Sequence, residues 1–102
     1  MKRGEVWWVE LPDRKRRPYV IMSRDSAVSV LTSVVAVACT RTRRNLPTEV
    51  PLDGSDGLPE PCVASFDNVA TLPKWAFVGR ITHLSTQQSV ELCIALRLAL
   101  DC

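Results

Sequence analysis

The sequence predicts a mainly β fold, a small β-barrel or sandwich with one C-terminal α-helix. Short segments rich in Val and aromatic residues alternate with turns as far as residue 82, and only the last part of the chain has a long helical pattern. The chain has 102 residues, of which 46% are hydrophobic and 24% charged. This length and composition are typical of one globular domain, so we expect a single domain over residues 1–102.

The N-terminal part predicts an antiparallel hairpin. Residues 5–11 (EVWWVEL) are rich in aromatic and β-branched residues and stand between Gly4 and Pro12, which are typical strand boundaries. After a short basic segment, Pro18 favours an extended entry into residues 19–23 (YVIMS). A connection as short as this one joins antiparallel strands.

The middle of the chain predicts a buried strand and an edge strand. Residues 24–31 are small and polar and are compatible with one helical turn. Residues 33–40 (SVVAVACT) are almost continuously apolar, which predicts a strand buried on both faces. Residues 48–52 predict a short strand, and Pro51 favours an edge position for it. Residues 53–61 contain two Gly and two Pro and predict a loop.

The last part predicts two more strands and the helix. Residues 62–69 alternate enough to form a strand, and residues 77–82 predict another. Ser85 can cap Gln88 in an S-x-x-Q arrangement, and residues 90–100 are apolar around much of the helix. We expect a deeply packed terminal helix, with contact to a partner subunit as the alternative.

Positive charge is concentrated in the first part of the chain. Residues 1–44 contain ten Lys and Arg against four Asp and Glu, a net charge of +6, whereas residues 45–102 have a net charge of −4. This asymmetry indicates a polyanionic partner, with a solvated Arg-rich face as the alternative. We favour the polyanion because most of the charge falls in two loops. These loops contain Arg14, Lys15, Arg16 and Arg17, and then Arg41, Arg43 and Arg44.

Several classes of protein are excluded. No apolar stretch reaches the roughly 18 residues of a membrane span, and no apolar signal core follows the N-terminal methionine. We therefore expect a cytoplasmic protein without membrane association. The cysteines, Cys39, Cys62, Cys93 and Cys102, include no C-x-x-C pair, and His83 is the sole histidine. We expect reduced thiols, no metal site and no cofactor.

Arg17 and Thr40 are candidates for phosphoryl-transfer chemistry. Pro18 fixes the backbone directly after Arg17, and a positioned guanidinium is what a phosphoryl-transfer transition state needs. Thr40 places a hydroxyl at the end of the predicted buried strand, although most such Thr residues bond nearby backbone. Cys39 beside it is expected to be a small buried residue.

Six short segments also occur in a distinctive order. They are Arg3-Gly4-Glu5-Val6-Trp7-Trp8, Arg16-Arg17-Pro18-Tyr19-Val20-Ile21, Ser23-Arg24-Asp25, residues 35–40, Leu46-Pro47-Thr48-Glu49-Val50, and His83-Leu84-Ser85 before the helix. Their order and spacing, through nearly the whole chain, resemble the MazF/PemK family of toxin–antitoxin endoribonucleases. The resemblance implies a homodimeric, SH3-like or CcdB-like β-barrel that cuts single-stranded RNA without metal and is silenced by a cognate MazE-like antitoxin.

The resemblance also implies roles for individual residues. In that family the Arg directly before Pro and the Thr that ends the long apolar strand are the catalytic pair, which are Arg17 and Thr40 here. The ribose 2′-hydroxyl would attack the adjacent phosphorus and leave a 2′,3′-cyclic phosphate and a 5′-hydroxyl. Arg17 would stabilise charge on the phosphoryl oxygens, and Thr40 would hold a phosphate oxygen or orient the attacking hydroxyl. The residues expected to bind RNA electrostatically are Arg14, Lys15, Arg16, Arg41, Arg43 and Arg44.

The first hairpin departs from the family pattern. The family usually carries a longer Gly-Ser-Glu-Gln-type loop there, whereas residues 13–16 here are short and basic, so no acidic loop residue carries over and substrate preference is expected to differ. Asp67 and Asn68 match a strand segment that lines the family's RNA groove, with a turn at a strand end as the alternative. Trp7 and Trp8 face opposite sides of their strand, and we expect core and interface roles, with base stacking as the alternative.

Two other functions fit parts of the sequence. A related barrel poisons DNA gyrase, but it depends on a Trp-Gly-apolar C-terminus, whereas this chain ends Leu100-Asp101-Cys102. The other is a barrel that holds RNA or an antitoxin without cutting. We favour the endoribonuclease, with mRNA, rRNA or tRNA as the substrate.

Overall fold

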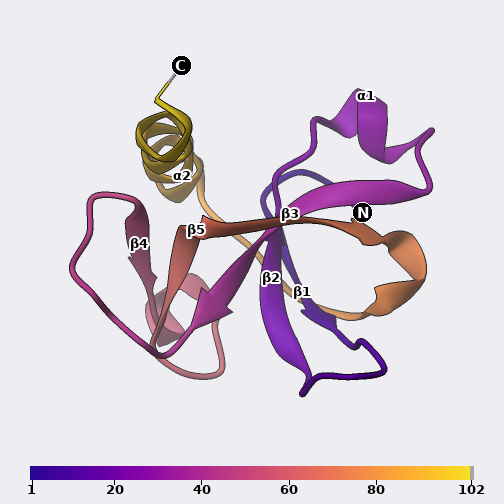
Figure 1. Ribbon diagram of the computed structural model, residues 1–102, viewed down its shortest axis with the longest axis horizontal. Helices are drawn as coiled ribbons and strands as arrows, with labels where there is room; N and C mark the ends of the chain where they lie inside the picture. The colour runs from indigo at the N-terminus through magenta and orange to yellow at the C-terminus, as the bar shows by residue number, and fades with distance from the viewer. Residues whose placement is uncertain (102) are drawn as a thin grey trace.

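The computed structural model describes residues 1–101, which form a six-stranded antiparallel sheet with a C-terminal helix (Figure 1). The predicted mainly β fold is therefore confirmed. The strands are β1 (Glu5–Val9), β2 (Arg17–Ile21), β3 (Ser33–Thr40), β4 (Glu49–Leu52), β5 (Cys62–Pro73) and β6 (Phe77–His83). The helices are α1 (Asp25–Val28) and α2 (Thr86–Leu100), with the 3₁₀-helices η1 (Gly54–Asp56) and η2 (Lys74–Ala76). None of the helices in this described part is long and apolar enough to cross a membrane.

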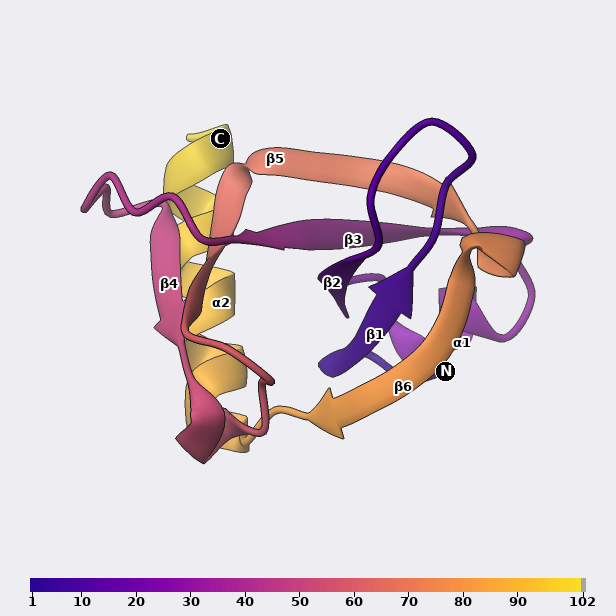
Figure 2. The same ribbon diagram turned by 90° about the horizontal axis from the view of Figure 1, so that it is seen from below.

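The strands run in the order β4-β5-β3-β2-β1-β6, and the sheet curls into a half-barrel (Figure 2). β1 and β2 form the predicted antiparallel hairpin, with Val6 opposite Val20. β4 lies at one edge of the sheet, as its Pro51 predicts, because proline has no N–H to donate to a second neighbouring strand. β3 lies in the middle and is buried on both faces as predicted, apart from its two ends and Val35, which is 37% exposed.

β2 begins at Arg17, earlier than the sequence predicts, because Trp8 pairs with Pro18 and Val9 with Arg17. A proline is tolerated near the start of a strand, where it removes only one hydrogen-bond donor from the ladder. Arg17 therefore has the backbone of a strand and not of a loop, which fixes the direction of its side chain.

β5 is longer than predicted, because it continues past Val69 to Pro73. Val37 of β3 faces Val69, but Cys39 faces Ala64, so residues 65–68 of β5 form a bulge at this irregular point of the ladder. The bulge interrupts the alternation of buried and exposed residues from which the strand was predicted. β5 also bends sharply along its length, as bulged strands do (Figure 2).

Helix α2 packs against β4 and β5 on one face of the sheet (Figure 1). The Ser85 hydroxyl accepts a hydrogen bond of 3.2 Å from the backbone N–H of Gln88, which confirms the predicted cap. The prediction of a deeply packed helix is wrong, because only one face of α2 contacts the sheet. Leu92 and Ala95 are its buried residues. The apolar residues that it exposes are Val90 (53% exposed), Ile94 (47%), Leu98 (51%) and Leu100 (62%).

The core lies on both faces of the sheet. One cluster fills the space between the sheet and α2 and includes Val20, Val37 and Leu92. The second lies on the opposite face, next to α1, and includes Ile21 and Val28. Both faces of β2 and β3 are therefore buried, which holds the ends of these two strands in place.

Gly57 is needed where η1 turns towards β5. Its φ is +94°, and a Cβ added there would lie 2.5 Å from the Oγ1 of Thr82 on β6. We expect Gly57→Ala to lower the free energy of unfolding by about 1–3 kcal/mol, because it adds backbone strain and a clash. Gly54→Ala is the matched control, since a Cβ there meets nothing within 4 Å. Urea unfolding of both variants measures the difference, and equal destabilisation would contradict this explanation.

Candidate active site

Arg17 and Thr40 lie at the ends of two neighbouring strands. Arg17 is the first residue of β2, and Thr40 is the last residue of β3. The two strands pair in antiparallel register with Tyr19 opposite Ala38. Continuing that register to the ends of the strands sets Arg17 opposite Thr40. Directly opposed residues have Cβ atoms about 4.5–5.5 Å apart, so residues far apart in the sequence become neighbours.

A cavity of about 570 Å³ opens beside these two residues, and both of them line it. Its other walls come from the first hairpin, from the loop after β3, and from the segment that leads into β5. The other residues that line it are Trp8, Lys15, Arg16, Pro18, Cys39, Arg41, Thr42, Pro59, Glu60, Pro61 and Cys62. The two predicted basic loops therefore meet at one surface.

The lining carries more positive than negative charge. Lys15, Arg16, Arg17 and Arg41 are its cations, and Glu60 is the one carboxylate among its residues. The Nη2 of Arg41 lies 2.6 Å from the Oε2 of Glu60, so an ion pair joins the loop after β3 to the loop before β5. Both side chains are more than half exposed, so the pair contributes little to stability. A phosphate group that entered the cavity would meet several cations and one partly neutralised carboxylate.

Thr40 keeps its hydroxyl available at the cavity wall. The hydroxyl donates to the backbone carbonyl oxygen of Thr42 over 3.4 Å, which is long for an O–H donor. A bond this weak lets the hydroxyl rotate and donate instead to an oxygen of a bound phosphate. Thr40 is half-buried, so its oxygen lies at the wall and not deep in the core.

Trp8 and Arg16 form a stacked pair in the cavity. The guanidinium carbon of Arg16 lies 4.4 Å from the centroid of the Trp8 ring, within the range of a cation–π contact. Trp7 points to the other side, where its indole N–H donates to the Oε1 of Glu5 over 3.0 Å and its ring packs against the second core cluster. Trp7 thus has the expected core role, whereas Trp8 presents a flat aromatic surface to the cavity.

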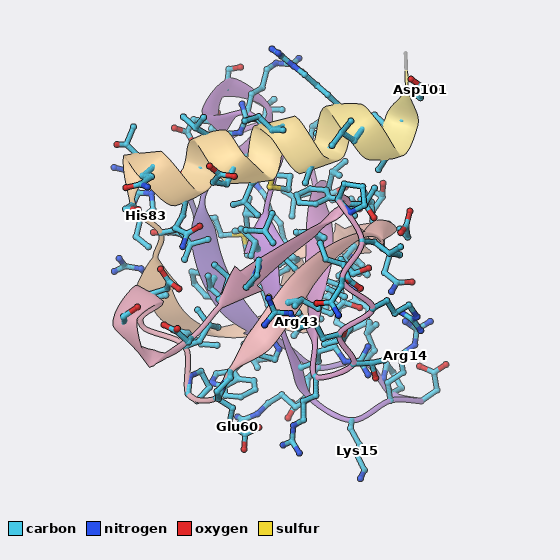
Figure 3. All side chains as sticks on the ribbon, turned by 90° about the vertical axis from the view of Figure 1, so that its left-hand side faces the viewer. Arg14, Lys15, Arg43, Glu60, His83 and Asp101 are labelled. Atoms are coloured by element: carbon cyan, nitrogen blue, oxygen red, sulfur yellow. The ribbon has the colours of Figure 1, made fainter. Side chains whose placement is uncertain are left out.

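Several of the expected RNA-binding residues lie outside this cavity. Arg14 lines a smaller neighbouring hollow of about 110 Å³, whose lining also includes Lys15 and Arg17. Arg43 and Arg44 are exposed on the loop after β3, where the backbone N–H of Arg44 donates to Glu49. Figure 3 shows Arg14, Lys15 and Glu60 at the end of the molecule away from α2, with Arg43 nearer the middle.

Asp67 and Asn68 are also outside the cavity lining. Both are exposed residues of the β5 bulge. The Oδ2 of Asp67 accepts a hydrogen bond of 2.8 Å from the hydroxyl of Thr48, just before β4. Asp67 therefore ties the bulge to the neighbouring edge strand.

Thr42, Glu60 and Cys62 line the cavity although the sequence did not single them out as site residues, and Trp8, for which base stacking was only the alternative, lines it as well. Trp8 is set by its pairing with Pro18, which follows Arg17 directly. Cys62 is the first residue of β5 and Glu60 lies just before it, and the start of β5 pairs with the end of β3. These residues could have been found only by predicting that the strand after residue 61 pairs with the end of the strand that finishes at Thr40.

Known proteins are similar to the chain over its whole length. Residues 2–100 match the family described as PemK-like, MazF-like toxin of type II toxin-antitoxin system. "Probable endoribonuclease MazF2" of Mycobacterium tuberculosis is 42% identical over 103 residues, covering 100% of both chains. "Probable endoribonuclease MazF5" of the same organism is 39% identical and covers 98% of this chain and 93% of its own.

Solved structures agree with these sequence matches. An endoribonuclease in complex with its cognate antitoxin from Mycobacterial species has a TM-score of 0.89 at 31% identity, covering 99% of this chain and 95% of its own. The Mycobacterium tuberculosis toxin MazF-mt6 has a TM-score of 0.87 at 35% identity, covering 95% of this chain and 96% of its own. The resemblance inferred from the order of the motifs is confirmed, and the chain belongs to the PemK-like, MazF-like toxins of type II toxin–antitoxin systems.

Proposed function

We propose that this toxin is an endoribonuclease that cuts single-stranded RNA with Arg17 and Thr40, and that the step needs no metal. The observation that carries the proposal is the meeting of these two residues at the wall of one basic cavity. The relatives named as endoribonucleases support the class of reaction. The catalytic unit is residues 1–102 as one toxin domain.

The nucleophile in this mechanism belongs to the substrate. The ribose 2′-hydroxyl loses its proton and attacks the adjacent phosphorus, the bond from phosphorus to the 5′-oxygen breaks, and the 5′-oxygen takes up a proton, which leaves a 2′,3′-cyclic phosphate and a 5′-hydroxyl. Arg17 donates N–H groups to the phosphoryl oxygens, where negative charge grows in the transition state. Thr40 donates its hydroxyl to another phosphate oxygen and so fixes the phosphorus against the attacking oxygen. No water has to be activated, so the step has no need for a metal-bound hydroxide.

The other cations of the site hold the RNA chain. Lys15, Arg16 and Arg41 would bind phosphates inside the cavity, and Arg14, Arg43 and Arg44 would extend the track outside it. A base would stack on the Trp8 ring by displacing the Arg16 guanidinium, which lies 4.4 Å from the ring centroid. Asp67 and Asn68 would contact base edges of a chain that continues along the β5 bulge.

The proposal is tested with purified protein, single-stranded mRNA, rRNA and tRNA, and a chelator. We expect cleavage to survive the chelator and the 3′ fragments to accept a labelled 5′-phosphate from a kinase without prior dephosphorylation. The matched control is the same RNA with a 2′-deoxynucleotide on the 5′ side of the cut, which should resist cleavage. Cleavage of that substrate, or cleavage that needs added divalent metal, would contradict the mechanism. RNA binding without any cleavage would show a binding barrel instead.

We further propose two protein partners and a place of action. One solved relative is in complex with its cognate antitoxin, and an acidic antitoxin segment would fit the same basic cavity. The second partner is another copy of the chain, bound through the apolar residues that α2 leaves exposed. We expect the toxin to act in the cytoplasm, because it would meet its RNA substrates and its antitoxin there.

Leu98→Glu is expected to weaken the proposed homodimer by about tenfold or more, because it puts a charge into an apolar interface. Leu98 is 51% exposed on α2. Val78→Glu is the matched control, since Val78 is 50% exposed on β6, at the sheet edge opposite β4. Analytical ultracentrifugation over a concentration series measures both dissociation constants. A Leu98→Glu dimer as tight as the unmodified one would place the interface elsewhere.

A further inference from the structure

Cys39 and Cys62 are neighbours in the wall of the proposed catalytic cavity. On β3 and β5, Thr40 is opposite Val63 and Cys39 is opposite Ala64. Side chains alternate along a strand, so Cys62 projects on the same face as Ala64 and therefore on the same face as Cys39. The two cysteines are diagonal cross-strand neighbours, and both line the cavity.

The two thiols differ in exposure and in the direction in which their pKa is shifted. Cys39 is 3% exposed, whereas Cys62 is half-buried and reachable from the cavity. The hydrogen bond with Cys62, together with burial, raises the pKa of the Cys39 thiol well above its usual value, and the nearby Arg17 guanidinium only partly opposes this. The same hydrogen bond lowers the pKa of Cys62, although burial and the carboxylates of Asp56, Asp53 and Glu60 act the other way. Cys62, the more exposed thiol, is therefore the one that peroxide in the cavity reaches first.

We propose that Cys39 and Cys62 are a peroxide-reactive pair whose disulfide inactivates the toxin. The proposal rests on the proposed function, because the disulfide acts on the residues next to Arg17 and Thr40. The reactive cysteine lies in the cavity, and its partner directly precedes Thr40 in the chain.

The oxidation takes two balanced steps with hydrogen peroxide as the oxidant. The Cys62 thiolate attacks one peroxide oxygen, the O–O bond breaks, and hydroxide leaves, so that Cys62 becomes a sulfenic acid. The Cys39 sulfur then attacks the Cys62 sulfur, its proton passes to the departing oxygen, and the S–O bond breaks as water leaves. Two thiols are oxidised to one disulfide, and one peroxide is reduced to two waters once the hydroxide takes up a proton.

The disulfide would change the cavity next to Thr40. A disulfide holds its two sulfur atoms about 2.05 Å apart and its Cα atoms about 5.5–6 Å apart, which is closer than diagonal cross-strand neighbours usually lie, so closing it draws the start of β5 towards the end of β3. Thr40 follows Cys39 directly, so this movement changes where its hydroxyl lies. A shift of about 1 Å in a positioning group is enough to slow catalysis by roughly a hundredfold.

Cys93 provides an internal comparison. It lies on α2 and is half-buried, and its Sγ accepts a hydrogen bond of 3.3 Å from the Nη2 of Arg3. It does not line the cavity. Selective reaction of the cavity pair would therefore reflect its surroundings and not the mere presence of a partly buried thiol.

The sequence makes the pairing easy to read by mass spectrometry. Trypsin separates all four cysteines, because Cys39 falls in residues 25–41, Cys62 in residues 45–74, Cys93 in residues 81–97 and Cys102 in residues 98–102. The reduced protein is treated with hydrogen peroxide, the remaining thiols are blocked with N-ethylmaleimide, and one part is digested while another is tested for RNA cleavage. We expect residues 25–41 linked to residues 45–74, a fall in cleavage of about tenfold or more, and recovery of both with dithiothreitol.

Three variants complete the test, each compared with its own untreated rate. Cys62→Ser should lose both the cross-link and the sensitivity to peroxide. Cys39→Ser should form no cross-link and should not show the loss of cleavage that dithiothreitol reverses; any loss that it does show should be irreversible, because Cys62 is then oxidised on to the sulfinic acid. Cys93→Ser should behave as the unmodified protein does.

Three results would overturn the proposal: no link between the two peptides, a link that leaves cleavage unchanged, or full sensitivity in Cys62→Ser. If the reduced protein cuts no RNA at all, the proposed function fails. The peptide link is measured without RNA, so it still decides whether the pair reacts with peroxide.

Discussion

Arg17→Ala is expected to lower the rate of RNA cleavage by about 10²–10³-fold, because it removes the group that stabilises charge on the phosphoryl oxygens. Arg17 is held at the start of β2, with Pro18 paired to Trp8 directly after it. Its loss should affect the transition state more than the bound substrate. Single-turnover cleavage with enzyme in excess measures the rate, and fluorescence anisotropy in chelator measures RNA binding separately.

Two further variants separate position from charge. Arg17→Lys keeps the charge but loses the planar fork that matches a phosphate, so we expect it to restore only a small part of the rate. Arg16→Ala removes the same charge from the neighbouring residue, which stacks on Trp8. It should weaken binding in a salt-dependent way with a much smaller effect on the single-turnover rate. Equal loss of rate in Arg16→Ala and Arg17→Ala would reduce Arg17 to one of several binding cations.

Thr40→Val is expected to slow cleavage by about a hundredfold while the free energy of unfolding changes little. Valine has nearly the same shape as threonine, so the substitution removes the hydroxyl and keeps the side chain at the end of β3. RNA affinity should be almost unchanged, because one hydroxyl contributes little beside the cations of the cavity.

Thr42→Val is the matched control for this variant. Thr42 also lines the cavity, and the bond from Thr40 goes to its backbone oxygen, which the substitution leaves in place. We expect less than about a threefold change in rate for Thr42→Val. The double variant Arg17→Ala/Thr40→Val should be much less impaired than the product of the single effects, because both residues act on one phosphate. A fully additive double variant would assign the two residues to independent tasks.

The elements that local patterns specify were predictable from the sequence. The hairpin follows from Gly4, Pro12 and Pro18, the edge strand from Pro51, and the helix start from Ser85. The sequence predicted β5 only as far as residue 69, whereas the strand continues to Pro73 because residues 70–73 pair with residues 33–36 of β3. The bulge at residues 65–68 was not predicted either, because a bulge depends on how two strands pair and residue preferences along one strand do not report it.

The packing of α2 shows a similar limit of local patterns. Its apolar residues cover more of the helix surface than one sheet can bury. The sequence reveals these additional apolar residues, but it does not show whether the chain itself or another subunit covers them. The structure shows that the chain itself does not cover these residues, because β4 and β5 cover only one face of the helix.

The candidate site was predictable only in part. Arg17 and Thr40 followed from the family resemblance, since an Arg before a Pro and a Thr at the end of a strand are common in unrelated proteins. Glu60 and Cys62 were not predicted, because they reach the cavity through the pairing of β5 with β3. The order of the strands in the sheet decides which residues line the cavity, and the chemistry of single residues does not reveal that order.

The ion pair between Arg41 and Glu60 bears on which anions the cavity accepts. Both side chains are more than half exposed, so the pair contributes little to stability and an entering phosphate can replace Glu60 on Arg41 at small cost. A nucleic acid chain that offers several phosphates would also contact Lys15, Arg16 and Arg17, and would therefore gain more from this cavity than a single phosphate does.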